Sequence, residues 1–381
     1  MIVVFVSNFY NHHQSDFSET LYRSDKIEFY FIETEKMEVE RLNMGWHISK
    51  PIFVHYYYDN PDYYLSLILR ADIVIFGYID YSIVKKRISS NKITFIYNER
   101  LYKKKLPIKN FLGRIIKLNF RYNHKNVFLL CASAFTYSDF LKTGSFFNRA
   151  YKWGYFPPLK QYQIEDLLIN KSSKITILWV GRFIDWKHPE TMLKLADYIK
   201  KATISVKIIM VGNGVMFDSI RQQINANKLS DIITLTGAME QENVRRIMET
   251  SNIFISTSDR NEGWGAVLNE AMNSGCAVIA SSLVGSAPFL IKDGYNGFIY
   301  KDGSFESLTE KVLKLINDPS LIRQFGERAY YTICETWNGK NAAKRLLLTA
   351  NALVEKDNIE FIEGPCSRAH FLKDNWYDED I

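Results

Sequence analysis

The sequence predicts an α/β protein made of two Rossmann-like domains that face each other across a cleft. The first observation is an alternation of short apolar runs with polar or amphipathic segments, which is typical of strand and helix units in a parallel sheet. The second is that this alternation restarts after a polar stretch at residues 159–174. A chain of 381 residues is long enough for two domains with separate cores.

The apolar runs mark the expected strands in order. In the first half they occupy residues 2–6, 27–32, 51–54, 73–76, 93–96, 127–133 and 151–158. In the second half they occupy residues 175–180, 206–211, 232–235, 253–256, 277–280 and 297–300. We therefore predict an N-terminal domain at residues 1–165 and a C-terminal domain at residues 166–340. Residues 341–381 are predicted to form a last helix and a tail that packs back on the N-terminal domain, with a loose acidic end at residues 378–380.

Composition excludes several classes of protein. The chain is 47% hydrophobic and 24% charged, as ordinary globular proteins are. Its four cysteines lie far apart, which argues against a zinc site or a disulfide framework and favours a reducing cytoplasm. No apolar run approaches the ~18 residues of a membrane span. The moderate net charge of +6 favours acidic small ligands or an anionic membrane surface over nucleic acid.

The stretch at residues 261–275 carries the strongest functional signal. A strand-like run precedes it, Gly263 and Gly265 lie in its loop, and a helical segment begins at Ala266. Glycines let the backbone approach a ligand, and a helix N-terminus attracts phosphate. Glu262 lies before the helix and Glu270 within it, so two carboxylates could accept hydrogen bonds from hydroxyl groups on either side of a diphosphate. Taken as an isolated pair, the two glutamates would more often be solvated surface residues; the glycines and the strand favour the binding site.

Two cations are predicted to serve the same site. Arg182 and Lys187 follow the first strand of the second domain, in the loop after Gly181. Fixed cations stabilise the negative charge that develops on a departing diphosphate. No metal is then required, and no Asp-x-Asp pattern stands near them. The alternative, two solvated loop cations, is disfavoured by the neighbouring glutamate stretch.

Polar side chains also follow strands of the first domain. His12 and His13 come after the first run, with Asn11 and Gln14 on either side of the pair. Glu99 and Arg100 follow the run at residues 93–96. These positions lie at the carboxyl edge of a doubly wound sheet, where ligands bind. Capping or loop packing is the alternative for the histidines. Metal binding is disfavoured because no third ligand with a suitable spacing is visible in the sequence.

The segment at residues 109–125 is predicted to be a basic amphipathic helix. One face carries the apolar residues Phe111, Ile115, Leu118 and Tyr122, and another carries Arg114, Lys117 and Arg121. An ordinary surface helix is one interpretation. The other is docking of the region from Lys103 to Lys125 on an anionic inner leaflet, where each basic side chain contributes ~1 kcal/mol.

The motifs of the second domain together resemble those of retaining, nucleotide-sugar-dependent glycosyltransferases of the family 4 type, which have the two-domain GT-B fold. The resemblance covers residues 175–336 and rests on three motifs in the family's order: Gly181-Arg182 with Lys187, Val211-Gly212-Asn213-Gly214, and the pair Glu262 and Glu270, which matches an E-x7-E motif. Trp264 replaces the commoner Phe, and His188 stands where Gly often follows the Lys.

The resemblance implies roles for these residues. Arg182 and Lys187 would hold the donor diphosphate, Glu270 the ribose hydroxyls and Glu262 the hydroxyls of the transferred sugar. Further donor contacts would come from Gly181, Gly212, the backbone of Gly263, Trp264, Gly265 and Ala266, and, near the nucleobase, Gly237, Ala238 and Met239.

The first domain departs from the usual family pattern. Asn11-His12-His13-Gln14 stands in place of a glycine-rich loop, which resembles a subgroup of polysaccharide and lipopolysaccharide synthesis. We therefore expect a cytoplasmic, metal-independent hexosyltransferase, at the inner membrane face, that uses a UDP-sugar and a saccharide or lipid-linked acceptor. His12 and His13 are the catalytic candidates on the acceptor side; Asn11, Gln14, Glu99 and Arg100 are the expected acceptor contacts. The alternatives are a nucleotide-sugar epimerase of the same fold and a non-catalytic nucleotide-sugar-binding protein.

Overall fold

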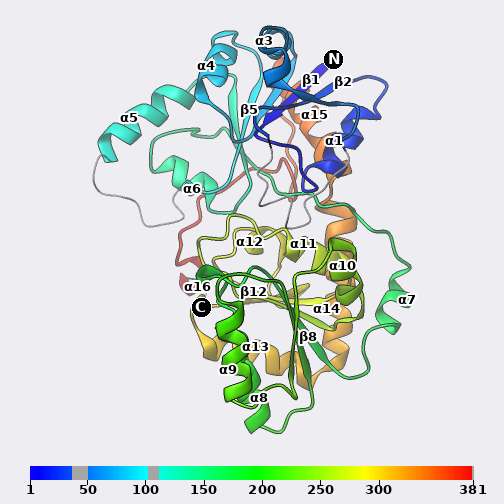
Figure 1. The fold of residues 1–381 in the computed structure, drawn as a ribbon. Coiled ribbons are helices and arrows are strands. Elements are labelled where there is room, and N and C mark those ends of the chain that lie inside the picture. Colours follow the sequence, from blue (N-terminus) through cyan, green and yellow to red (C-terminus); the bar gives the residue numbers. More distant parts are fainter. Residues whose placement is uncertain (37–49, 102–110, 380–381) are drawn as a thin grey trace. The chain divides into compact units, whose positions relative to one another are not determined.

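The computed structural model describes residues 1–36, 50–101 and 111–379, and these form two compact units (Figure 1). Unit 1 comprises Met1–Pro158 and Thr336–Lys373, and unit 2 comprises Leu159–Glu335 and Asp374–Ile381. Each unit is built on a parallel sheet with helices packed on it. Two α/β units with parallel sheets agree with the fold class predicted from the alternating apolar runs.

Unit 1 contains a seven-stranded parallel sheet in the order β3-β2-β1-β4-β5-β6-β7. Its strands are β1 (Ile2–Ser7), β2 (Glu28–Glu33), β3 (Val54–Tyr56), β4 (Ile73–Phe76), β5 (Thr94–Asn98), β6 (Val127–Cys131) and β7 (Ala150–Lys152). The central strands are buried on both faces, which is why they read as continuous apolar runs. The chain passes from β1 to β2 and β3 on one side, then returns to β4 on the other side of β1.

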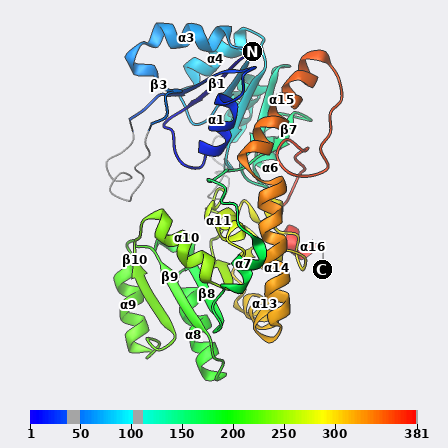
Figure 2. The same cartoon turned by 90° about the vertical axis from the view of Figure 1, so that its right-hand side faces the viewer.

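The helices of unit 1 include one that comes from the end of the chain. They are α1 (Ser15–Tyr22), α3 (Pro61–Arg70), α4 (Tyr81–Ser89), α5 (Phe111–Tyr122), α6 (Thr136–Leu141) and α15 (Gly339–Glu355), with a short 3-10 helix at Tyr57–Asp59. Helices α1 and α15 lie side by side (Figures 1 and 2). The amide of Gly339 donates to Asp16 Oδ2 at 2.9 Å. A Cβ at Gly339 would lie 2.4 Å from the backbone nitrogen of Phe17, so this approach requires glycine.

Unit 2 contains a six-stranded parallel sheet in the order β10-β9-β8-β11-β12-β13. Its strands are β8 (Thr176–Val180), β9 (Lys207–Val211), β10 (Ile233–Gly237), β11 (Ile253–Ser256), β12 (Ala277–Ser281) and β13 (Gly297–Tyr300). The helices are α7 (Ile164–Ile169), α8 (Glu190–Lys201), α9 (Phe217–Ala226), α10 (Gln241–Thr250), α11 (Val267–Asn273), α12 (Ala287–Leu290), α13 (Phe305–Asn317), α14 (Pro319–Tyr331) and α16 (Trp376–Glu379), with a 3-10 turn at Asp185–Lys187.

The division of the chain differs from the predicted boundaries at both ends of unit 2. The polar stretch after Pro158 already belongs to unit 2, because the amide of Lys160 donates to Asn273 Oδ1 at 2.9 Å and the amide of Tyr162 donates to the Tyr330 hydroxyl at 2.9 Å. At the other end, the expectation of a loose acidic terminus is wrong for Asp378. Its carboxylate lies 2.9 Å from Lys301 Nζ, and the neighbouring Trp376 donates to the carbonyl of Ser282 at 3.0 Å.

In the described residues, every helix is too short or too polar to cross a membrane.

Candidate functional site

The loops after β8 and β11 meet at the topological switch point of unit 2. Strands β8 and β11 are neighbours, with Ile177 beside Ile253, but β9 and β10 extend from β8 in one direction and β12 and β13 extend from β11 in the other. In open α/β sheets, ligands bind at the carboxyl edge where the strand order reverses in this way. The predicted cations follow β8 and the predicted glutamate stretch follows β11, so both predictions fall on this point. The strand order that identifies it is not readable from the sequence.

Lys187 and Glu262 form an ion pair across the switch point. Each side chain is only 15% exposed. A partly buried pair is screened less by solvent than a surface pair, so its charges act strongly on a ligand that enters between them. The pair places one ammonium group and one carboxylate together. These are the groups that phosphate oxygens and sugar hydroxyls require.

Buried contacts hold the two loops in this arrangement. The indole nitrogen of Trp179 in β8 donates to the Thr257 hydroxyl at 2.8 Å, and that hydroxyl donates to the carbonyl of Lys187. The amide of Asp259 donates to the carbonyl of Trp186 at 3.0 Å. The backbone on both sides of the ion pair is therefore fixed by the structure beneath it.

Gly212 allows the loops after β8 and β9 to approach each other. Its φ is +133°, and a Cβ at this position would lie 1.9 Å from the carbonyl oxygen of Gly181. No other residue fits without moving that backbone. The glycine predicted as a donor contact thus shapes the Gly181 loop, and the same loop carries Arg182 and Lys187.

The turn before α11 is organised by Asp259 and Trp264. The amide of Asn261 donates to Asp259 Oδ1 at 2.7 Å, and the amide of Glu262 donates to the Asp259 carbonyl at 3.0 Å. Trp264 is 0% exposed, and its indole nitrogen donates to Asn269 Oδ1 at 2.8 Å. Because the ring belongs to the core, only the backbone of Trp264 could contact a donor, as expected for the backbone from Gly263 to Ala266.

Glu270 lies beside the loop that follows β10. Gln241, the first residue of α10, donates to Glu270 Oε1 at 2.8 Å. The preceding loop contains Ala238 and Met239, both exposed, so the residues predicted near ribose and nucleobase lie close together. Arg182 is also exposed, and its guanidinium carbon lies 5.4 Å from the centre of the Trp186 ring.

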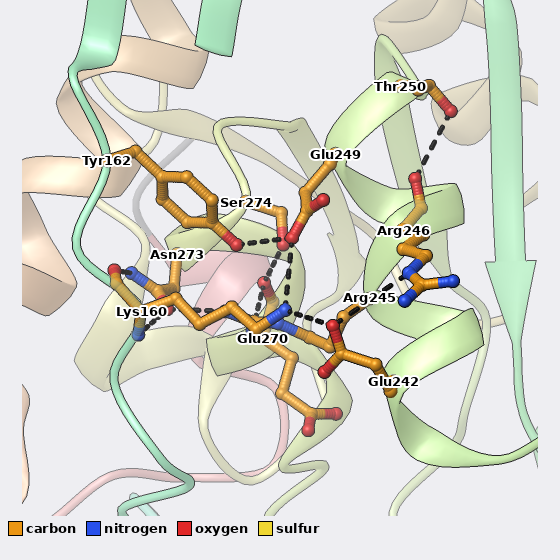
Figure 3. A network of polar contacts seen from close by, with 10 residues as sticks. All are labelled: Lys160, Tyr162, Glu242, Arg245, Arg246, Glu249, Thr250, Glu270, Asn273 and Ser274. Atoms are coloured by element: carbon orange, nitrogen blue, oxygen red, sulfur yellow. Dashed lines mark hydrogen bonds and ion pairs between the residues drawn. The ribbon is translucent and has the colours of Figure 1, made fainter.

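A polar network anchors α11 on the side away from the carboxylate of Glu270 (Figure 3). Arg245 donates to the Glu270 carbonyl at 2.9 Å and to Asn273 Oδ1 at 2.6 Å. Lys160 and Tyr162 both contact Glu249 in α10, at 3.3 Å and 2.5 Å. The carboxylate of Glu270 points away from this network (Figure 3). The network therefore fixes the helix and leaves the carboxylate on the other side.

In unit 1, the predicted residues His12, His13 and Glu99 are brought together around Tyr155. The two histidine rings lie 3.9 Å apart, and the ring of His13 stacks on Tyr155 with centroids 5.0 Å apart. The Tyr155 hydroxyl donates to Glu99. Burial, and then the neighbouring His12, lowers the pKa of His13 well below its ordinary value. Tyr155, which the sequence pattern places only in a strand, thus connects two of the predicted candidates, His13 and Glu99.

Arg100, Asn11 and Gln14, the other residues predicted on the acceptor side, make contacts within unit 1. Arg100 is 3% exposed, forms an ion pair with buried Asp139 at 3.4 Å and lies over the Phe135 ring. Asn11 accepts from the amide of His13 at 2.9 Å. Gln14 is buried, and its side-chain oxygen lies 3.4 Å from the amide of Asn11. These contacts of Asn11 and Gln14 organise the loop before α1, and their acceptor roles stay predictions. The prediction for Arg100 is corrected, because the chain folds its guanidinium group into the core.

Comparison with known proteins finds a family match in the second half of the chain. Residues 162–332 match the family Glycosyl transferases group 1. The glycosyl transferases group 1 match lies inside unit 2 and contains the ion pair at the switch point. It includes both glutamates of the stretch at residues 261–275.

Relatives with curated descriptions match over the same region. An uncharacterized glycosyltransferase of Methanocaldococcus jannaschii is 33% identical over 183 residues, which covers 47% of this chain and 46% of the relative. The poly(glycerol-phosphate) alpha-glucosyltransferase of Bacillus subtilis is 25% identical over 184 residues, covering 48% of this chain and 27% of the relative. The aligned part of this chain thus spans about half or less of the relatives' length.

Solved structures extend the likeness in fold to most of the chain. The structure of HepE from Anabaena in complex with UDP matches with a TM-score of 0.68 and 14% identity, covering 92% of this chain and 100% of that one. The predicted resemblance to glycosyltransferases of the GT-B fold is therefore confirmed. Retention of configuration and membership of family 4 remain predictions.

Proposed function

We propose that this protein is a retaining, metal-independent glycosyltransferase that moves a hexose from a UDP-sugar to a saccharide or lipid-linked acceptor in cell-surface polysaccharide synthesis. The observation that carries the proposal is the pairing of Lys187 with Glu262 at the switch point of unit 2. The relatives' names and the UDP in the HepE complex support the class of donor and acceptor.

The cations would act on the leaving group. As the bond between the sugar carbon and the β-phosphate oxygen breaks, negative charge grows on the diphosphate. Arg182 and Lys187 would stabilise that charge, Lys187 exchanging its carboxylate partner for phosphate oxygens. Glu262, released from the ion pair, would accept hydrogen bonds from hydroxyl groups of the transferred sugar. Glu270 would accept from the ribose hydroxyls.

The acceptor would react on the same face of the sugar. Its oxygen forms the new bond to the anomeric carbon while the proton of its hydroxyl passes to the departing diphosphate, so the products are a glycoside and a protonated nucleoside diphosphate. His12, His13, Glu99 and Tyr155 are the groups of unit 1 that we assign to the acceptor side. Neutral His13 can accept a hydrogen bond from a sugar hydroxyl.

The test is turnover of a panel of UDP-, GDP-, ADP- and dTDP-sugars with EDTA present. Lys187→Ala and Glu262→Gln should each reduce kcat/KM for one donor by about 10²-fold to 10³-fold, the effect of removing one transition-state contact. Arg221→Ala is the matched control, because Arg221 is an exposed cation of unit 2 that pairs with Asp218 in α9.

Three results would contradict the proposal. Loss of turnover in EDTA would overturn metal independence. Conversion of the donor to an isomeric sugar without acceptor would identify an epimerase. Binding of nucleotide sugar with no turnover, even with lipid-linked saccharides supplied, would identify a non-catalytic binding protein.

We further propose that α5 docks unit 1 on the anionic cytoplasmic face of a membrane. Leu112, Ile116 and Phe120, spaced four residues apart on one helical stripe, are 75%, 68% and 74% exposed. Lys117 and Arg121 lie on the same helix. The predicted apolar face is different: Ile115, Leu118 and Tyr122 are only partly exposed. The side chains of Phe111 and Arg114 and residues 102–110 lie outside the described part of the chain.

Vesicle flotation tests the docking proposal. We expect the wild type to float with phosphatidylglycerol vesicles at low salt and to stay unbound with phosphatidylcholine vesicles. Leu112→Ser combined with Phe120→Ser should abolish flotation. The matched control combines Ile169→Ser with Ile362→Ser, which removes two other exposed apolar side chains, 67% and 101% exposed. Equal flotation of the two double variants would contradict the proposal.

A further inference from the structure

His188 connects the two loops that carry the ion pair of unit 2. It directly follows Lys187, and its backbone is left-handed, with φ +48° and ψ 52°. Few residues other than glycine adopt this conformation readily. Its ring lies between two carboxylates. Nδ1 is 2.9 Å from Oε1 of Glu190, and Nε2 is 3.5 Å from Oδ2 of Asp259.

Each carboxylate belongs to an element that positions the site. Glu190 is the first residue of α8, whose inner face is buried in the core of unit 2. Asp259 organises the turn after β11 through the amides of Asn261 and Glu262. The ring of His188 therefore ties the turn that holds Glu262 to the start of a rigid helix.

More acidic than basic groups surround the ring of His188. Lys187 precedes it and is paired with Glu262. Glu190 and Asp259 face the ring directly. Asp302, which follows β13, interacts electrostatically with His188 and Asp259. Lys194, one turn along α8, interacts electrostatically with Glu190. The hydrogen bond with Glu190 raises the pKa of His188 above its ordinary value, although burial opposes this. Only a protonated imidazole can donate from both nitrogens at once.

We propose that His188 is a positioning residue of the donor site, whose protonated ring holds Asp259 and Glu190 together and thereby keeps Glu262 opposite Lys187. The effect on turnover rests on the proposed function. Because protonation is favoured in the folded state, the contact is complete at acidic pH and is lost as pH rises through the raised pKa of His188. Loss of a proton removes the charge of the ring and one of its two N–H groups, so the ring attracts the two carboxylates less and the turn before α11 loosens.

Donor kinetics between about pH 5.5 and about pH 9 test this role. In the wild type, KM for the donor should rise about tenfold with pH, the size expected for one charge-assisted hydrogen bond, and kcat should change less. His188→Asn can adopt the left-handed backbone but cannot become charged. The His188→Asn variant should have, at every pH in this range, the donor KM that the wild type has at high pH. A pH dependence in His188→Asn equal to that of the wild type would overturn the proposal.

Two controls separate positioning from a general structural effect. His188→Gly removes the ring and relieves the backbone, so it should keep its thermal stability yet have the same flat, raised KM. His124→Asn removes an exposed histidine of unit 1 and should reproduce the wild-type profile. A His188→Gly variant with wild-type KM at low pH would contradict the positioning role.

NMR gives a readout that needs no turnover. The ring of His188, identified by its absence in His188→Asn, should titrate above the ordinary value of about 6.5 and return toward it in Glu190→Gln. The amide signals of Gly263 and Gly265 should follow this titration in the wild type and not in His188→Asn. If no donor is turned over but these signals behave as stated, the proposed function fails and the positioning contact stands; if the glycine amides ignore the titration, the contact fails.

Discussion

His13 in unit 1 and His188 in unit 2 follow the first strand of their sheets, yet their surroundings shift their pKa values in opposite directions. The ring of His13 is stacked on Tyr155 and lies beside His12, and burial lowers its pKa. The ring of His188 lies between two carboxylates, and its pKa is raised. Loops that follow the first strand of two similar sheets thus favour the neutral ring in one unit and the protonated ring in the other. The cluster in unit 1 is mostly aromatic, with Glu99 as its carboxylate, whereas the site in unit 2 is built from charged groups.

Two arginines at the carboxyl edges give the largest expected contrast. Arg100→Ala should lower the free energy of unfolding by about 3–5 kcal/mol, because it removes the buried guanidinium group from the buried carboxylate of Asp139 and leaves Lys142, whose Nζ lies 4.0 Å from Oδ1 of Asp139. Arg182→Ala should leave stability within about 0.5 kcal/mol, since Arg182 is exposed, and should instead reduce turnover. Urea unfolding of both variants measures the change in stability, and donor kinetics measure the change in turnover. A stable Arg100→Ala variant with impaired acceptor KM would restore the acceptor role first expected for Arg100.

The neutral state of His13 should make unit 1 sensitive to acid. A histidine whose pKa is depressed by folding contributes stability above the unfolded value, about 6.5, and this contribution is lost as pH falls below it. The thermal midpoint of the wild type should therefore decrease below this pH more steeply than that of His13→Asn. Differential scanning calorimetry over the acidic range measures the difference. Parallel curves for the two proteins would mean that His13 does not titrate differently on folding.

The C-terminal tail should give the smallest effect. Asp374 forms an ion pair with Arg260 at 3.0 Å, and Arg260 belongs to the loop that carries Glu262. Partly exposed pairs contribute about 0–1 kcal/mol, so Asp374→Asn should raise donor KM by about twofold and hardly change stability. Asp378→Asn removes a more exposed pair, with Lys301, and serves as the control. If Asp378→Asn raised donor KM more than Asp374→Asn, the pair of Asp374 with Arg260 would not be the contact that supports the donor loop.

Sequence patterns were sufficient where burial alone determines structure. Strands such as Ile253–Ser256 are buried on both faces and therefore consist of apolar residues in a continuous run. The number and order of the βα units could for this reason be predicted from the sequence. The same reading placed Arg182, Lys187 and Glu262 in loops after strands. The structure then brought two of them into contact.

Sequence patterns failed where a residue's neighbours come from distant parts of the chain. Arg100 and Asp139 are separated by 39 residues, and nothing local predicts that the loop cation after β5 is buried. Tyr155 reads as a strand residue until Glu99 and His13 are placed beside it. The exposed stripe of α5 is likewise undetermined by periodicity, since that helix has apolar residues on more than one side.

The sequence by itself determined the two α/β halves, the glycine and glutamate stretch after β11 and the cations after β8, because burial, backbone freedom and charge are properties of the residues in order. Only the tertiary structure decided that β8 and β11 are neighbours, that Lys187 meets Glu262 and that His188 lies between Glu190 and Asp259. These contacts depend on strand order and side-chain packing, which join residues that are far apart in the chain.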